Sequence, residues 1–186
     1  NIAWLGVVCG TIQVGFYSTS TRLYTIIIAF FTAFTGVMFP RLSSLLSQGE
    51  TKEFWEKISL SVNALFSFAF PVLCLAIIFG PTLLHFLVGD GFEGAYLPFQ
   101  IISSLILIIG YEQILVIQIL MPMKHDRVIL RNSIAGAFVA IILNLIIVEK
   151  MGAMGTAIVW LASESCVLFL SLLYLKKHSD YKFPKA

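Results

Sequence analysis

The chain has 186 residues, of which 59% are hydrophobic and 12% are charged. Ordinary globular domains carry about 25% charged residues, and a soluble domain of this size would leave roughly a third of its extended-chain surface in water. Composition therefore excludes a soluble globular enzyme, a disordered tail and a fibrous protein. The net charge of +2 is too small for a nucleic-acid-binding surface, so we expect no nucleic-acid partner.

Apolar stretches long enough to cross a bilayer, which takes about 20 residues, cover residues 17–39, 58–79, 96–121, 128–148 and 153–175. Helix-breaking residues bound them: Pro40 follows the first stretch, Gly80 and Pro81 end the second, Pro122 stops the third and Gly152 opens the fifth. Because the chain opens at Asn1 inside an apolar stretch, we expect residues 1–10 to be the end of a truncated helix. The sequence thus predicts an all-α, polytopic membrane bundle over residues 1–175.

Basic residues are concentrated in every second loop between the predicted spans. Ten of the 12 Lys and Arg flank the first and third loops or follow the last span: Arg41, Lys52, Lys57, Lys124, Arg127, Arg131, Lys176, Lys177, Lys182 and Lys185. By the positive-inside rule, loops 48–56 and 123–126 and the basic tail 176–186 should be cytoplasmic. We expect a multi-pass membrane protein with a cytoplasmic C-terminus.

Polar and small residues recur at helical spacing within each span. Examples are Ser59, Asn63, Ser67, Pro71 and Cys74 in the second span, Gln100, Ser104, Tyr111 and Gln118 in the third, and Asn132, Gly136, Ala140 and Asn144 in the fourth. Lipid tails offer such groups no hydrogen bonds, so these faces should turn toward other helices or a water-filled cavity. The alternative for the small residues is a close-packing seam. Pro71 lies mid-span and predicts a kink.

Three ionisable residues lie inside spans, namely Arg22, Glu112 and Glu164. A charge at mid-bilayer costs about 2.5–3.5 kcal/mol even on the lenient insertion scale, so such groups are usually paired, neutralised or lining a pathway. Glu112 and Glu164 therefore predict a cavity that binds substrate or a coupling ion, and Asn63, Gln118 and Asn144 are further candidates to line it. The alternative is a buried, protonated carboxyl that bonds a neighbouring helix. Arg22 would either snorkel to the headgroups or bind an anionic substrate headgroup.

Other chemistry is not indicated. Cys9, Cys74 and Cys166 are scattered among apolar residues, and the three histidines have no ligand spacing to one another or to cysteine. No nucleophile elbow or phosphate-binding loop occurs. We therefore expect no catalytic residue, no metal and no cofactor, and a protein that is not an enzyme.

Short motifs in order along the chain carry a family resemblance. They are Val14-Gly15-Phe16-Tyr17, Arg22-Leu23, Phe39-Pro40-Arg41-Leu42-Ser43, Phe79-Gly80, Gly91-Phe92-Glu93-Gly94-Ala95, Gln118-Ile119-Leu120-Met121-Pro122 and Gly152-Ala153-Met154-Gly155-Thr156-Ala157. Over about 150 residues this order resembles the polysaccharide-transport flippases, the O-antigen (Wzx-type) members of the multidrug/oligosaccharidyl-lipid/polysaccharide exporter superfamily.

The resemblance implies the second of two six-helix lobes around a central cavity, with the first lobe as its partner. It implies alternating access that moves a lipid-linked oligosaccharide across the membrane, with membrane lipid around the lobes and polysaccharide polymerase machinery as a further possible partner. Glu164 or Glu112 would then be the carboxylate that couples transport to a proton or sodium gradient. Two alternatives stay open: a multidrug or peptidoglycan-precursor exporter on the same scaffold, and a membrane glycosyltransferase or ligase.

Overall fold

A computed structural model describes residues 2–178 of the chain, and every structural statement below concerns this part. The elements in chain order are α1 (Ile2–Ser47), α2 (Thr51–Val88), η1 (Glu93–Ala95), α3 (Tyr96–Ser103), α4 (Leu105–Gln113), η2 (Ile114–Leu120), α5 (Asp126–Leu143), η3 (Asn144–Val148) and α6 (Glu149–His178). All are helical, η1 being a 3₁₀-helix and η2 and η3 π-helical segments. The prediction of an all-helical bundle is confirmed.

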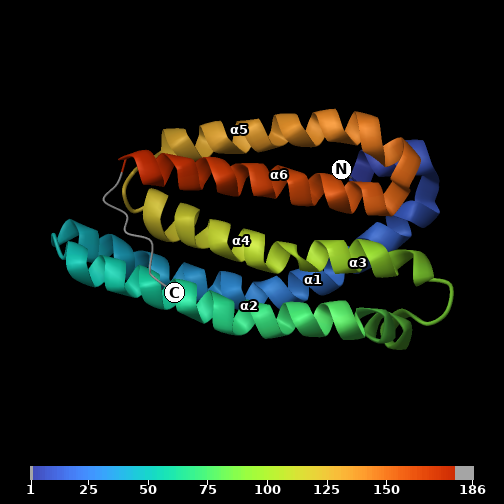
Figure 1. Ribbon diagram of the computed structural model, residues 1–186, viewed down its shortest axis with the longest axis horizontal. Helices are drawn as coiled ribbons and strands as arrows, with labels where there is room; N and C mark the ends of the chain where they lie inside the picture. Colours follow the sequence, from blue (N-terminus) through green and yellow to red (C-terminus); the bar gives the residue numbers. More distant parts are fainter. Residues whose placement is uncertain (1, 179–186) are drawn as a thin grey trace.

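The helices run side by side along the long axis of the molecule (Figure 1). The α1–α2 hairpin forms one side, the α5–α6 hairpin forms the other, and the continuous stretch α3–α4–η2 lies between them. Helix α6 contacts α1, α3, α4 and α5, so it occupies the middle of the bundle. Side chains that α6 shares with its neighbours are therefore the ones most enclosed by protein.

The chain changes direction at two glycines, each inside an element that is otherwise a single helix. Gly10 (φ 83°) separates a short helical piece at residues 2–9 from the long helix that follows. Gly152 (φ 55°) lies where the chain turns back from η3 into α6. Positive φ favours glycine because it has no Cβ. At Gly152, an added Cβ would also collide with the side chain of Gln13.

Among the described residues, four helical stretches are long and apolar enough to cross a membrane: Ile2–Ser47, Thr51–Val88, Glu93–Leu120 and Asp126–His178. The last one folds back at Gly152 and contains both of the expected spans 128–148 and 153–175. The protein is therefore a polytopic helical bundle whose apolar outer surface suits lipid.

Two predicted helix ends are wrong. Helix α1 continues through Pro40 to Ser47, and α2 continues through both Pro71 and Pro81 to Val88. A proline removes one backbone hydrogen bond, which a long helix held by its neighbours tolerates. Gly80 serves packing here, because an added Cβ would come within 2.9 Å of the Phe99 ring on α3. A kink at Pro71 stays a prediction.

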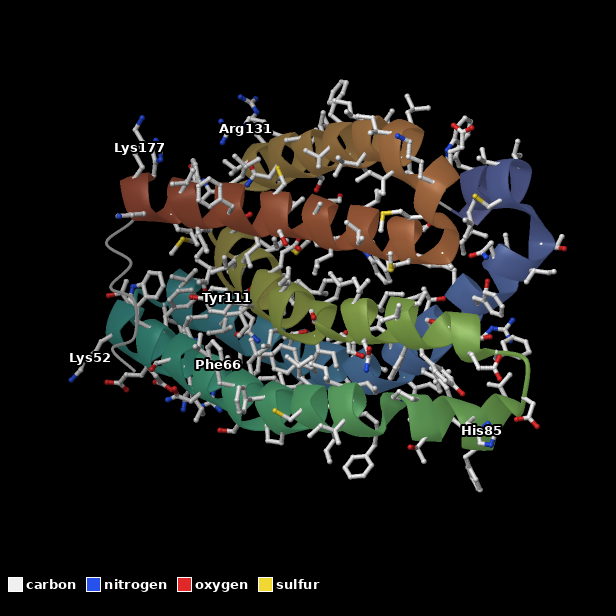
Figure 2. All side chains as sticks on the ribbon, turned by 45° about the vertical axis from the view of Figure 1, so that its right-hand side comes forward. Lys52, Phe66, His85, Tyr111, Arg131 and Lys177 are labelled. Atoms are coloured by element: carbon white, nitrogen blue, oxygen red, sulfur yellow. The ribbon has the colours of Figure 1, made fainter. Side chains whose placement is uncertain are left out.

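Basic residues collect at one end of the bundle. Figure 2 shows Lys52, Arg131 and Lys177 at this end and His85 at the opposite one. This agrees with the distribution of Lys and Arg in the sequence, since every second turn between helices lies at the same end. Lys176 and Lys177 of the predicted basic tail belong to α6, whereas Lys182 and Lys185 lie outside the described residues.

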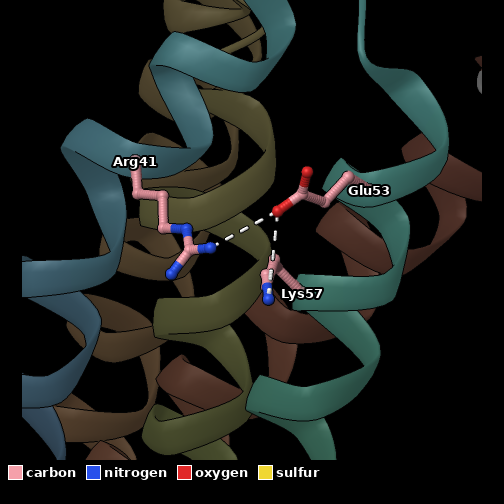
Figure 3. Close-up of polar contacts among 3 residues, drawn as sticks. All are labelled: Arg41, Glu53 and Lys57. Carbon is pink, nitrogen blue, oxygen red and sulfur yellow. Dashed lines mark hydrogen bonds and ion pairs between the residues drawn. The ribbon is translucent and has the colours of Figure 1, made fainter.

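The α1–α2 turn at the basic end is braced by one shared carboxylate. Oε1 of Glu53 lies 3.3 Å from Arg41 Nη2 and 3.9 Å from Lys57 Nζ (Figure 3). All three side chains keep contact with solvent, where ion pairs contribute at most about 1 kcal/mol. The cluster therefore orders the turn more than it stabilises the bundle.

The polar stripe of α2 does not pack against the other described helices, and its expected place on a water-filled cavity stays a prediction. Asn63 and Ser67 are exposed, on the side of α2 opposite its buried residues Ile58, Leu65 and Ala69. The buried side packs against α4, where an added Cβ on Gly110 would collide with Leu65. Close packing against a glycine thus decides which side of α2 turns inward.

The polar stripe of α5 does turn inward, as predicted. Asn132 is buried and donates from Nδ2 to Ser171 Oγ of α6 at 3.1 Å. Ser163 Oγ donates to the carbonyl of Gly136 at 3.0 Å. An added Cβ on Gly136 would collide with Val167, so the two helices approach closely here. The α5–α6 contact therefore combines a small-residue seam with polar bonds.

Candidate functional site

The structure brings together two of the predicted residues, Glu112 from the end of α4 and Glu164 from the middle of α6. Both side chains line one small pocket of about 210 Å³. Each side chain is half-buried. Two acids that are 52 positions apart in sequence thus form one site within the apolar part of the bundle. This site is called the acid pair below.

Aromatic side chains hold Glu164 in place. Trp160, one turn earlier on α6, donates from Nε1 to Glu164 Oε1 at 3.0 Å. The Trp160 ring packs edge-on against Tyr24 of α1, with ring centroids 5.3 Å apart. The carboxylate of Glu164 is therefore oriented by a donor that is itself fixed by packing.

A polar brace from α1 to α4 lies next to Glu112. Gln113 donates from Nε2 to Thr32 Oγ1 at 3.0 Å and accepts a bond from Thr35 Oγ1 at 3.1 Å. Thr32 in turn donates to the carbonyl of Ile28. Gln113 also lines the pocket of the acid pair. The brace positions the end of α4 relative to α1 and so helps to place Glu112.

A larger open pocket of about 680 Å³ adjoins Glu164 on another side. Its lining combines aromatic, hydroxyl and acidic groups: Ile2, Ala3, Tyr17, Thr21, Trp160, Ser163 and Glu164. Glu164 lines both pockets and so lies between the acid pair and this larger open pocket. Among the described residues, no group of three or more His, Cys, Asp and Glu could hold a metal ion.

Arg22 and Asn63, two other residues predicted for the cavity, lie apart from the acid pair. Arg22 is exposed on α1, and no ion pair within residues 2–178 joins it to an acid. Asn63 lies on the outer side of α2. The structure therefore does not place either side chain at the acid pair.

Gln118 and Asn144 lie in the two π-helical segments, and the sequence did not indicate these segments. Gln118, in η2, is fully buried, and neither its Oε1 nor its Nε2 has a hydrogen-bond partner among the described residues. Asn144, at the start of η3, donates to the carbonyl of Ala140 at 2.7 Å and lines a pocket with Trp4. Neither side chain lines the pockets around Glu164.

Sequence reasoning did not single out Tyr24 or Gln113. It did place Trp160 on the polar face of the last span together with Glu164, because residues four apart on a helix are neighbours, and the indole N–H is a donor in need of an acceptor. Gln113 follows Glu112 directly, but its partners on α1 are set by tertiary packing. Nothing in the sequence indicated that Tyr24 belongs to the site, since a tyrosine in an apolar span is common.

Comparison with known proteins gives one family match. The model of a family described as "Polysaccharide biosynthesis protein" matches residues 2–97, more than half of the chain. The matched part includes α1 and α2 and ends at the start of α3. The acid pair lies beyond it.

Two curated relatives align with almost the whole chain. A protein of Escherichia coli named as an O-antigen transporter is 24% identical over 175 residues, which are 94% of this chain and 42% of the relative. A protein of Haloferax volcanii named as a low-salt glycan biosynthesis flippase is 23% identical over 189 residues, 98% of this chain and 39% of the relative. The chain thus spans about two-fifths of these relatives. No solved structure shows significant similarity to it.

Proposed function

The chain belongs to the polysaccharide biosynthesis protein family, and we propose that it acts as one lobe of a flippase that moves a lipid-linked oligosaccharide across the membrane. The names of both curated relatives support this proposal. Because the chain spans about two-fifths of each relative, the working transporter would need a second lobe. The proposed pathway lies between the two lobes, and access would alternate between the two sides of the membrane.

The observation that carries the proposal is the acid pair beside an open pocket with hydroxyl and acidic groups in an otherwise apolar bundle. A protein that only anchored other components in the membrane would not need Glu112 and Glu164, since ionisable groups at membrane depth are costly. A substrate with a polar sugar head and an apolar tail matches this surface, because the head needs polar partners and the tail needs lipid. The proposed location is the bacterial inner membrane, with the basic end cytoplasmic.

Transport can be tested in the native host. Deleting the gene should make lipid-linked oligosaccharide accumulate and reduce surface polysaccharide, and the intact gene should restore both. Glu164→Gln in the intact gene should lower surface polysaccharide by about ten- to a hundredfold, since losing a charged hydrogen-bond partner costs about 1–3 kcal/mol. Glu149→Gln is the matched control, because Glu149 is exposed at the turn into α6. Unchanged lipid-linked oligosaccharide after gene deletion would contradict the proposal.

A further inference from the structure

The basic end of the bundle has two sides that differ in net charge. Residues 41–57, around the α1–α2 turn, hold three basic and three acidic residues, so their formal net charge is zero. Residues 121–131 and 172–178, at the end of the α5–α6 hairpin, hold five basic residues and one acid, Asp126, which gives a net charge of +4 with neutral histidines. These five basic residues are called the basic surface below: Lys124, Arg127, Arg131, Lys176 and Lys177.

Membrane orientation does not explain this difference. The positive-inside rule counts Lys and Arg, and acidic residues contribute little to it. The neutral α1–α2 side satisfies that rule, since it holds three basic residues of its own. The excess of positive charge on the α5–α6 side therefore has another cause.

The two sides also differ in how their charges are paired. On the α1–α2 side, Glu53 pairs with both Arg41 and Lys57. Within residues 2–178, none of the five residues of the basic surface forms an ion pair, and all five are exposed. Their positive charge is therefore available to a partner outside the chain.

The packing of α5 against α6 brings these cations together. The two helices run antiparallel, and Asn132 of α5 bonds to Ser171 of α6. Arg127 lies five positions before Asn132, and Lys176 lies five positions after Ser171. Because every helical residue advances by the same rise, Arg127 and Lys176 lie at the same level of the hairpin.

Figure 2 shows that the two basic sides are separate surfaces. Arg131 and Lys177 point away from the bundle on one side of the basic end, and Lys52 lies on the other side. A partner that contacts the α5–α6 hairpin therefore meets the basic surface without meeting the paired charges of the α1–α2 turn.

Aromatic rings join the two helix ends that carry the basic surface. The ring of His125, at the start of α5, packs edge-on against Tyr174 of α6, with centroids 5.5 Å apart. Tyr174 stacks in turn on His178, with centroids 4.5 Å apart. Tyrosine is enriched where a membrane helix reaches the headgroups, and Tyr174 lies at the end of the apolar part of α6. The basic surface is therefore held at the depth of the lipid headgroups.

Lys124 has a basic side chain where the backbone favours glycine. Its φ is 60°, and no other non-glycine residue among those described has a positive φ. This conformation costs free energy for any residue with a Cβ, and glycine would avoid that cost. The strain at this position indicates a use for the lysine side chain in the turn.

We propose that the basic surface binds the headgroups of anionic phospholipids in the surrounding bilayer. Arginine holds a phosphate through two parallel N–H···O bonds, and lysine adds a compact positive charge. Clusters of about four to eight basic residues next to a membrane-spanning helix attract anionic lipids. Phospholipid is the expected partner because its headgroups are the anions that lie at the depth of these side chains. This binding does not depend on the proposed transport activity.

Thermal unfolding of the protein in a neutral detergent, with increasing phosphatidylglycerol, measures the binding. A ligand that binds the folded state raises the unfolding temperature, so phosphatidylglycerol should do so, and phosphatidylcholine with the same acyl chains should have a much smaller effect. Each basic residue near the headgroups changes the affinity by about fivefold. The triple variant Arg127→Gln, Arg131→Gln, Lys177→Gln should therefore raise the apparent dissociation constant by about a hundredfold.

A matched triple variant removes the same charge from the other side of the basic end. Arg41→Gln, Lys52→Gln, Lys57→Gln should raise the apparent dissociation constant by less than about fivefold, because those charges are already balanced by acids. Asp126→Asn should lower it by up to about fivefold, which misfolding could not cause. Circular dichroism checks that every variant remains helical.

Three results would overturn the proposal. Equal losses of affinity in the two triple variants would mean that the lipid responds to total charge and not to this surface. Equal stabilisation by phosphatidylcholine, or by inorganic phosphate at the same concentration, would mean that the surface does not select anionic lipid. If the first triple variant does not fold, Asp126→Asn decides, and an unchanged affinity for phosphatidylglycerol in that variant would refute the binding surface.

Discussion

Asn132 of α5 donates a hydrogen bond to Ser171 of α6, and both side chains are buried where the two helices cross. Hydrogen bonds between membrane helices contribute about 0.6–2 kcal/mol. Ser171→Ala should therefore lower the free energy of unfolding by about 1 kcal/mol, measured by unfolding the chain in mixed micelles. Ser133→Ala, at the exposed neighbour of Asn132, should have no measurable effect. Equal losses in the two variants would contradict this account of the α5–α6 contact.

Gly110 permits the close approach of α4 to α2. Gly110→Ala should destabilise the chain by about 1–3 kcal/mol, because the new methyl group would overlap the side chain of Leu65. Leu65→Ala in the same chain should recover part of that loss, which a double-mutant cycle of unfolding free energies measures. Gly36→Ala is the control, since an added Cβ at Gly36 meets nothing within 4 Å. Additive effects at Gly110 and Leu65 would show that the two sites do not touch.

Gln113 joins α4 to α1 through two hydrogen bonds. Gln113→Leu removes both bonds at similar side-chain size and should lower the unfolding free energy by about 1–2 kcal/mol. Asn63→Leu makes a comparable polar-to-apolar change on the outer side of α2, where it should leave stability unchanged or raise it. Thermal unfolding of both variants in the same detergent distinguishes them. A larger loss for Asn63→Leu would mean that the outer stripe of α2 packs against another part of the protein.

The orientation of the bundle can be measured with topology reporters. Alkaline phosphatase fused after Gly91 should be active, because the α2–α3 turn lies at the end opposite the basic residues and should be outside the cytoplasm. Green fluorescent protein fused after Gly49, in the α1–α2 turn, should fluoresce, because that turn should be cytoplasmic. The reverse pattern at both positions would invert the predicted topology.

Much of the architecture follows from local properties of the chain. Apolar stretches of membrane length predict the helices, and the stretch that ends before Pro122 does end there. Pro40 and Pro81 misled the prediction, since a helix held by its neighbours passes through a proline that would end an isolated one. The spacing of polar and small residues correctly predicted the inward side of α5, whereas the similar stripe on α2 lies away from the other described helices. In a bilayer, lipid and protein interior are both apolar, so hydrophobicity does not tell which side of a helix faces its neighbours.

For the acid pair, too, the sequence predicts one part and the tertiary packing decides the rest. The sequence alone singles out Glu112 and Glu164, because a carboxylate inside an apolar membrane helix costs free energy whichever neighbours the helix has. That they meet is a tertiary result: α4 and α6 are distant in sequence, and their side chains converge only because α6 packs in the middle of the bundle. Tyr24 and Gln113 join the site for the same reason, whereas Trp160 is a neighbour of Glu164 on the same helix. Local chemistry marks which residues need a partner, and only the packing of the helices decides which partner each one finds.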